Sequence, residues 1–230
     1  MKLEIGRPSG ARASLVERVA EIRAQLADAA RAVGRDPEAV RLVGVSKRQP
    51  REIVLAAVAA GLDEIGESYV QEAEAKLAGL PVHVRKHFIG HVQSNKAKAI
   101  VRTFDVVQSV DRLAAGLALA KAARELGRSV TALVQVNISP TERYGIAPGD
   151  ARELAERLRE AGLEVDGVMA IGPLTNDRAA IRSAFETAGE TFQRVGGTTL
   201  SLGMSGDYRE AIACGSTMIR IGTALFGARV

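Results

Sequence analysis

The sequence is poor in the residues that build disulfides, cysteine-rich metal sites and aromatic surfaces. Among 230 residues there is one cysteine, Cys214, and no tryptophan, and aromatic side chains make up only 3%. A single cysteine excludes an internal disulfide and a metal site made of several cysteines, so a reducing cytoplasm is the expected environment. The scarcity of aromatic rings argues against a surface that stacks nucleic-acid bases.

Long hydrophobic runs are also missing. No apolar stretch approaches the roughly 18 residues that a membrane span needs. The first residues, MKLEIGRPSGARASLVERVAEIR, contain no apolar core of the kind found in signal peptides. We therefore expect a cytoplasmic protein that does not contact a membrane.

The positive charge of the chain is modest and dispersed. Lysine and arginine total 31 against 27 acidic residues, which gives a net charge of +4, and no dense basic run occurs. Nucleic-acid binding normally uses a concentrated basic surface. We therefore expect no nucleic-acid partner and favour a small anionic ligand.

What the sequence does contain is a regular alternation of short apolar runs and helical patterns. A first amphipathic helix spans Ser14 to Gly34, with apolar residues at helical spacing. The apolar runs then cover residues 41–46, 62–67, 86–91, 104–110, 130–138, 164–172, 198–203 and 217–227. Helical patterns separate them at residues 50–60, 69–78, 94–102, 111–126, 149–161, 177–195 and 206–214.

This alternation predicts an α/β fold. The runs are too apolar for strands with one exposed face, and they suit parallel strands covered on both sides. Eight such strands fit a closed (β/α)8 barrel of the TIM type with an extra N-terminal helix. A doubly wound open sheet is the alternative, because periodicity does not report closure. No linker or low-complexity segment divides the chain, so residues 1–230 are expected to form one domain.

The most informative strand end is LVGVSKRQP, residues 42–50. In such a barrel the chemistry lies at the carboxyl ends of the strands, and Lys47 comes directly after the first one. It is either an ordinary surface charge that closes a strand or an amine held in a pocket. Desolvation and like-charge repulsion from Arg48 and Arg51 would lower the pKa of Lys47, and the neutral amine is the form that attacks a carbonyl carbon.

Two later strand ends carry groups that bind anions. Ser205 follows the seventh run and is expected to open a helix, and Gly222 and Thr223 are expected in the eighth strand. In barrels, the loops after strands seven and eight often form a phosphate site from hydroxyls and backbone N–H groups. The alternative is structural, with Ser205 as a helix cap and Gly222 as a packing residue.

The three histidines do not suggest a metal site. His87 and His91 flank the letters FIG at a spacing of four, but no third ligand lies nearby, and His83 is expected in a loop. We expect structural or supporting roles for His87 and His91, and no bound metal.

Eight motifs follow one another along nearly the whole chain. They are LVGVSKRQP, EIGESYVQEAEAK, KHFIGHVQSNKAK, VQSVDR, LVQVNIS, GVMAIGP, LSLGMSGDYREAI and GSTMIRIGTALFGAR. In this order they resemble the pyridoxal 5′-phosphate (PLP) homeostasis protein family, also called the PLP-binding or proline-synthetase co-transcribed family. Its members look like the barrel domain of alanine racemase without the second domain.

The resemblance implies a set of cofactor-binding residues. Lys47, in the motif VSK, would hold PLP as an internal aldimine. Ser205, Gly222 and Thr223 would contact the phosphate. Met204 would line the pocket wall, and Arg220 would face the pyridine nitrogen.

Two positions depart from the family pattern. The family usually reads GEN where this chain has GES, so Ser68 replaces an asparagine near the cofactor, and cofactor orientation or affinity is expected to differ. After VNIS the family usually carries a lysine before the next glycine, whereas this chain reads PTERYGI, with Arg143 near that place. Arginine does not form an aldimine at neutral pH, which puts transfer of PLP through a second lysine in question.

The resemblance implies a non-catalytic protein that takes part in intracellular PLP homeostasis and delivers PLP to apo-enzymes. A permanently charged Arg220 would leave the pyridine nitrogen unprotonated and weaken the electron sink that carbanion chemistry uses. The alternative is a weak amino-acid racemase, which needs a second base opposite Lys47; Tyr69 and Tyr144 could approach the barrel mouth. A lysine-dependent aldolase on the same fold is a third alternative. Without the second racemase domain the racemase dimer interface is missing, so a monomer is expected.

Overall fold

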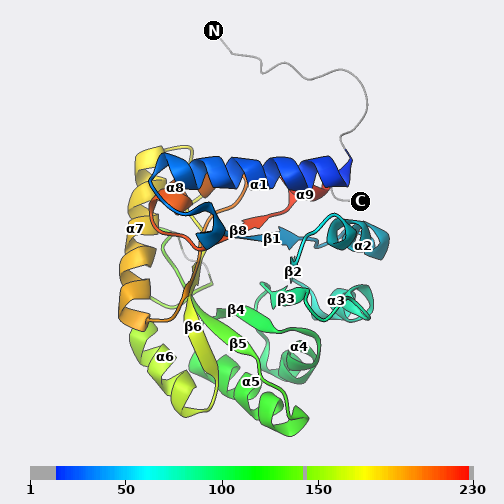
Figure 1. Ribbon diagram of the computed structural model, residues 1–230. Coiled ribbons are helices and arrows are strands. Elements are labelled where there is room, and N and C mark those ends of the chain that lie inside the picture. The colour runs from blue at the N-terminus through cyan, green and yellow to red at the C-terminus, as the bar shows by residue number, and fades with distance from the viewer. Residues whose placement is uncertain (1–13, 142–143, 228–230) are drawn as a thin grey trace.

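Each of the eight apolar runs overlaps one strand, and the strands pair in parallel and in chain order. In this computed structural model, which describes residues 14–141 and 144–227, the sheet closes where β1 pairs with β8 (Figure 1). The closed (β/α)8 barrel is confirmed and the open sheet is wrong. The strands are β1 Arg41–Val45, β2 Glu64–Glu67, β3 Arg85–Phe88, β4 Val106–Val110, β5 Thr131–Val136, β6 Glu164–Ala170, β7 Thr199–Ser201 and β8 Met218–Ile221.

Helices surround the barrel, and all the α-helices of the described residues except α9 overlap predicted helical segments. The α-helices are α1 Leu15–Ala32, α2 Arg51–Ala59, α3 Val70–Leu77, α4 Ala97–Thr103, α5 Leu113–Leu126, α6 Ala151–Glu160, α7 Arg178–Val195, α8 Tyr208–Ala213 and α9 Thr223–Phe226. Two short 3-10 helices, η1 Pro37–Ala39 and η2 Ser94–Lys96, precede β1 and α4.

The extra N-terminal helix, α1, begins with a capping box. The Ser14 hydroxyl accepts the N–H of Glu17 at 3.2 Å, and the Glu17 carboxylate accepts the N–H of Ser14 at 2.7 Å. The helix packs against α2, α8 and α9 (Figure 1), and Arg18 Nε donates to the carbonyl oxygen of Leu225 at 2.7 Å. It therefore covers the part of the barrel where β8 meets β1.

Side chains along the strands alternate between the helical shell and the barrel interior. On β8, Ile219 and Ile221 belong to the hydrophobic core, whereas Met218 and Arg220 contact polar side chains of other strands. The face of β8 that carries Arg220 is therefore the face that lines the barrel.

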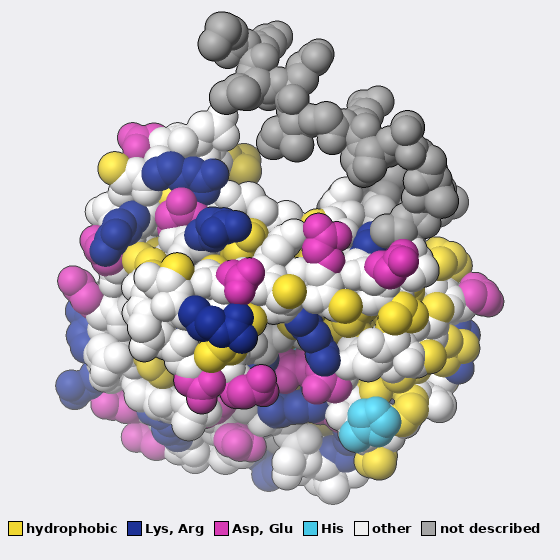
Figure 2. All heavy atoms as spheres, turned by 45° about the horizontal axis from the view of Figure 1, so that its top comes forward, with side chains coloured by type: hydrophobic (Ala, Val, Ile, Leu, Met, Phe, Trp, Pro, Cys, Tyr) yellow, Lys and Arg dark blue, Asp and Glu magenta, His cyan; other side chains and the backbone are white. Residues whose placement is uncertain are grey.

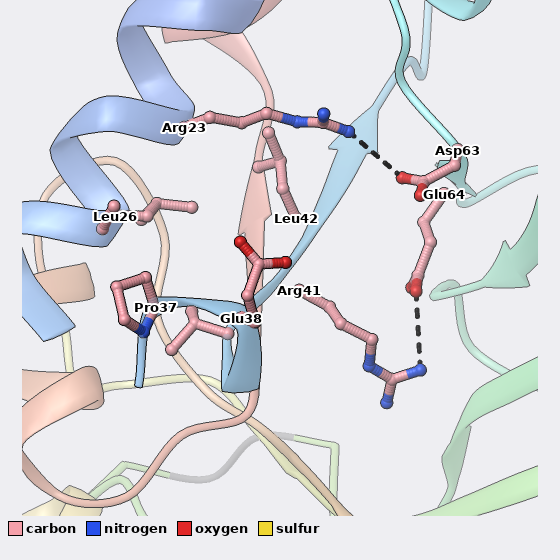
Figure 3. Close-up of a pocket in the computed structure, with 10 residues that line it drawn as sticks. Arg23, Leu26, Pro37, Glu38, Arg41, Leu42, Asp63 and Glu64 are labelled. Carbon is pink, nitrogen blue, oxygen red and sulfur yellow. Dashed lines mark hydrogen bonds and ion pairs between the residues drawn. The ribbon is translucent and has the colours of Figure 1, made fainter. Parts of the chain in front are cut away.

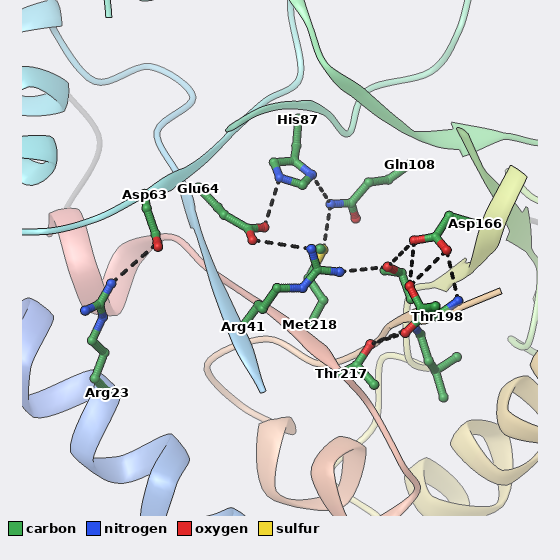
Figure 4. Close-up of polar contacts among 12 residues, drawn as sticks. Arg23, Arg41, Asp63, Glu64, His87, Gln108, Asp166, Thr198, Thr217 and Met218 are labelled. Atoms are coloured by element: carbon green, nitrogen blue, oxygen red, sulfur yellow. Dashed lines mark hydrogen bonds and ion pairs between the residues drawn. The ribbon is translucent and has the colours of Figure 1, made fainter. Parts of the chain in front are cut away.

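The amino-terminal part of the barrel interior is polar (Figure 4). Arg41 donates to Glu64 Oε1 at 3.4 Å and to Thr199 Oγ1 at 2.7 Å. His87 Nε2 lies 3.0 Å from Glu64 Oε2, and Gln108 Nε2 donates to His87 Nδ1 at 2.9 Å. These contacts connect five of the eight strands across the interior.

Two predicted boundaries near the C-terminal end are wrong. The helix expected to open at Ser205 begins three residues later, at Tyr208, because residues 205–207 form a turn. In that turn Asp207 Oδ1 accepts the N–H of Met204 at 2.6 Å.

The last apolar run is not a single strand. Strand β8 ends at Ile221, and Gly222 and Thr223, which were expected in the strand, form the start of α9. Gly222 has a φ of −108° and a ψ of −90°, which lies outside the extended region and ends the strand.

Within the described residues, no helix combines the length and the apolar character needed to cross a bilayer. On the face shown in Figure 2, basic and acidic side chains are interspersed.

Candidate functional site

The strand-end lysine lies in a cavity with the start of α9. Lys47 is half-buried and lines a small hollow of about 20 Å³ together with Gly222 and Thr223. Strands β1 and β8 are neighbours in the barrel, so residues that are 175 positions apart in the sequence meet at the same edge. Three of the six predicted cofactor residues are thus brought together.

The first turn of α9 begins at this cavity. The N–H groups of Leu225 and Phe226 both donate to the carbonyl oxygen of Gly222 at 2.9 Å. The N–H groups that precede them in a helix have no carbonyl partner within the helix. Thr223, the first residue of α9, is exposed and carries a hydroxyl. Hydroxyl and backbone N–H donors are the groups that bind a phosphate.

Arg220 is buried inside the barrel and held by three hydrogen bonds. One terminal nitrogen donates to the carbonyl oxygen of Ser201 at 2.8 Å and to its hydroxyl at 2.7 Å, and the other donates to the carbonyl oxygen of Ala170 at 2.8 Å. Burial lowers the pKa of Arg220 to about 10, against the opposing effect of the Asp207 charge. The guanidinium therefore remains a cation at neutral pH.

The contact network of the barrel interior extends to Arg220. The Ser201 hydroxyl, which accepts from Arg220, donates to Gln108 Oε1 at 2.8 Å. Gln108 in turn contacts His87 (Figure 4). The orientation of Arg220 is thus fixed by Ser201 of β7, which is itself held by Gln108 of β4.

Met204 and Ser205 lie on the turn before α8, and the structure places them differently. Met204 lines a second hollow of about 350 Å³ with Gly206, Asp207 and residues 172–176. Ser205 is exposed and lines neither this hollow nor the one at Lys47. Burial raises the pKa of Asp207, whose carboxylate closes the turn.

His87 and His91, the two histidines on either side of the letters FIG, both contact other side chains. His87 is fully buried in the interior network, which confirms the structural role predicted for it. His91, beyond the end of β3, stacks on the Tyr144 ring with centroids 4.1 Å apart and contacts Arg112 at 3.2 Å. Among the described residues, no group of three potential ligands could hold a metal ion.

The other residues that the sequence analysis named near the site follow strand ends of the barrel or fall outside the described residues. Tyr69 and Tyr144 are 49% and 65% exposed. Ser68 is half-buried, and its carbonyl oxygen lies against Gly90. Arg143 falls outside the described residues. Arg51 donates to the carbonyl oxygens of Ala75 and Lys76 at the end of α3, at 3.2 and 2.6 Å.

Sequence reasoning did not find the buried ion pair behind Lys47. Lys76 of α3 reaches Glu67 at the end of β2 at 2.8 Å, and both side chains are at least nine-tenths buried. The only signal was their presence in the motif EIGESYVQEAEAK, since a lysine in a helix ordinarily lies at the surface.

A further hollow, of about 270 Å³, opens at the opposite end of the barrel (Figure 3). Four of its charged side chains form two ion pairs: Arg23 with Asp63 and Arg41 with Glu64, both at 3.4 Å. The chemistry of such barrels lies at the carboxyl ends of the strands. We therefore take the Lys47 end as the candidate site.

Comparison with known proteins gives the family. The family model described as "Alanine racemase, N-terminal domain" matches residues 18–230. The pyridoxal phosphate homeostasis protein of Pseudomonas aeruginosa is 43% identical over 223 residues, covering 94% of this chain and 96% of its own. The chain belongs to the pyridoxal phosphate homeostasis protein family.

Solved structures agree with this membership in the homeostasis protein family. PipY of Synechococcus elongatus is 37% identical and covers 93% of this chain and 100% of its own. The TM-score is 0.82 for PipY without PLP and 0.80 for PipY with PLP bound. The predicted family and the barrel fold are both confirmed.

Proposed function

We propose that this chain binds PLP covalently through Lys47 and takes part in PLP homeostasis as a non-catalytic carrier. The observation that carries the proposal is the cavity shared by Lys47, Gly222 and Thr223, which brings a lysine together with a threonine and the start of a helix. The name of the Pseudomonas aeruginosa relative and the PLP bound to PipY support the same ligand here.

The residues present fit the chemical parts of PLP. When bound, PLP supplies an aldehyde that combines reversibly with amines. Lys47 would attach it through the side-chain amine. Gly222, Thr223 and Ser205 would contact the phosphate. Met204 would line the pocket wall, and Arg220 would face the pyridine nitrogen. Of these, Ser205 and Arg220 line neither hollow, so their roles rest on the resemblance to the family.

A carrier role is supported by the charge of Arg220. A cation held by Ala170 and Ser201 would not protonate the pyridine nitrogen, and PLP enzymes that stabilise carbanions usually use a carboxylate there. Release of PLP would follow from exchange of the Lys47 attachment with water or another amine.

The proposal also covers the number of domains, the oligomeric state and the cellular location of the protein. The closure of β1 on β8 supports one domain over residues 1–230, because the barrel, as far as the structure describes the chain, has no free strand edge for another unit to complete. We further propose a monomer in the cytoplasm that delivers PLP to apo-enzymes.

Titration of the apo protein with PLP, followed by visible absorbance, tests the proposal. We expect one PLP per chain and a yellow band in the wild type and in Lys121→Ala, an exposed lysine on α5 that serves as the matched control. Lys47→Ala should lack the band. Equal absorbance and affinity in Lys47→Ala would contradict attachment at this residue.

Incubation of the loaded protein with an L-amino acid separates a carrier from a racemase. We expect negligible formation of the D-amino acid. Sustained racemisation at about 1 per second or faster, lost in Lys47→Ala, would replace the carrier with a racemase.

A further inference from the structure

A buried polar cluster lies directly behind the strand end that carries Lys47. Its members, called here the Lys76 cluster, are Ser46, Glu67, Glu72 and Lys76. Ser46 and Glu67 are fully buried, and Lys76 is 6% exposed. The carrier role proposed above uses none of these four side chains.

The ammonium group of Lys76 is fully satisfied inside the cluster. It donates to the carbonyl oxygen of Ser46 at 2.9 Å, to Glu67 Oε1 at 2.8 Å and to Glu72 Oε1 at 2.5 Å. An ammonium group has three hydrogens to donate, so these acceptors use all of them. Loss of any one acceptor would leave a buried donor without a partner.

The cluster holds the backbone on both sides of Lys47. Before it, Ser46 is bound through its carbonyl oxygen to Lys76 and through its hydroxyl to Glu67 Oε1, at 2.6 Å. After it, the N–H of Arg48 donates to Glu72 Oε1 at 2.7 Å. Lys47 therefore leaves a turn whose two neighbours are tied to the same cluster.

The conformation of Arg48 shows that this turn is constrained. Its backbone φ is +60°, a left-handed value that residues other than glycine rarely adopt. Such a conformation persists where the surrounding structure holds it, and it is typical of functional sites. Two hydrogen bonds hold it here: the N–H of Gln49 donates to the carbonyl oxygen of Ser46 at 3.0 Å, and the N–H of Arg48 donates to Glu72.

We propose that Lys76 and Glu72 are positioning residues of the PLP site, which fix the Ser46–Arg48 turn so that the Lys47 amine enters the cavity lined by Gly222 and Thr223. The ligand in this inference rests on the proposed function, but the constrained turn does not. Lys76 acts through Ser46, and Glu72 acts through both Lys76 and Arg48.

Substitution of Glu72 tests the inference. The Glu72 side chain is 29% exposed, and the buried Lys76 keeps its ion pair with Glu67 when Glu72 is replaced, so we expect the variant to fold. We expect Glu72→Ala to weaken PLP binding about tenfold, the size of effect that loss of a charge-assisted hydrogen bond has. Glu72→Gln keeps an oxygen for the Arg48 N–H and should restore most of the affinity. Glu74→Ala, an exposed glutamate on the same helix, is the matched control and should match the wild type.

Two measurements on the apo protein keep this test independent of PLP. Competitive acylation, read by peptide mass mapping, should change the labelling of Lys47 relative to exposed Lys121 in Glu72→Ala but not in Glu74→Ala. Hydrogen exchange at the Arg48 amide should accelerate in Glu72→Ala and stay slow in Glu72→Gln.

The outcomes separate the two proposals. Unchanged PLP affinity, Lys47 labelling and Arg48 exchange in Glu72→Ala would overturn the positioning role while leaving the carrier in place. A wild type that does not bind PLP would overturn the carrier, and the apo measurements would then decide the positioning role alone.

Discussion

At the scale of single residues, His87 shows how burial favours the neutral form of a side chain. The imidazole is fully buried, and this desolvation lowers its pKa against the opposing effect of Glu64. Burial alone would raise the pKa of Glu64, but the contact with His87 and the charges on Arg41 and Arg85 outweigh it, and the net pKa is lowered. A neutral imidazole that accepts from Gln108 and faces an ionised Glu64 satisfies both results.

This protonation state predicts a pH dependence of stability. Below about pH 6.5, the usual histidine pKa, the imidazole binds a proton in the unfolded chain but not in the barrel. His87 should therefore lower the free energy of unfolding as the pH falls from 7 to 5, by at most about 1.4 kcal/mol per pH unit. Denaturant unfolding at several pH values measures this slope.

Other buried groups also contribute to the measured slope. Burial raises the pKa of Glu67 and Asp207, which gives the opposite pH dependence, whereas the lowered pKa of Glu64 gives a pH dependence of the same sign as His87. The contribution of His87 is therefore read from a comparison of two histidine variants. His87→Gln should lose the part of the slope that His87 contributes, and His83→Gln, at an exposed position, should keep it. Equal slopes in the wild type and His87→Gln would show that His87 does not titrate differently in the two states.

At the scale of elements, the site depends on how closely the segments after the strands approach each other. Gly90, after β3, lies so near the segment after β2 that an added Cβ would overlap the carbonyl oxygen of Ser68. Its own carbonyl oxygen accepts from the Ser109 hydroxyl on β4. Gly90 thus fixes the spacing of three neighbouring strand ends.

Gly90→Ala should therefore push Ser68 away and lower the free energy of unfolding by about 1–3 kcal/mol, as overpacking usually does. Gly149→Ala is the control, because no atom lies within 4 Å of an added Cβ there. Denaturant unfolding measures both variants. A Gly90→Ala protein as stable as Gly149→Ala would contradict the close approach.

The start of α9 gives a second prediction at this scale. Thr223→Val removes the hydroxyl and keeps the shape, so PLP affinity should fall about tenfold if the hydroxyl binds the phosphate. The thermal midpoint should not change, because Thr223 is exposed. Thr103→Val, on α4, is the control, and equal affinities of the two variants would remove Thr223 from the phosphate site.

At the scale of the whole molecule, most of the architecture was predictable from the sequence. Parallel strands covered on both sides are apolar along their whole length, and the helices between them have a different period, so the alternation is visible in the letters. Closure was not visible there. It depends on the pairing of residues 41–44 with residues 218–221, which lie at opposite ends of the chain.

What the sequence could not show were features that arise only when distant segments meet. The letters TALF continue the apolar run of β8, so periodicity did not separate α9 from the strand. Lys76 looked like an ordinary helical lysine, and only the folded chain brings Ser46, Glu67 and Glu72 around its ammonium group. The positions of Lys47, Gly222 and Thr223, by contrast, followed from the rule that barrel sites lie at the carboxyl ends of the strands.

The most direct test of the central claim is borohydride reduction of the PLP-loaded protein followed by peptide mass mapping. Reduction makes the attachment permanent, so the modified lysine can be identified among the seven lysines of the chain. We expect loss of the yellow colour and one adduct, on the peptide that contains Lys47. An adduct on another lysine, or none on a protein that had bound PLP, would contradict the account.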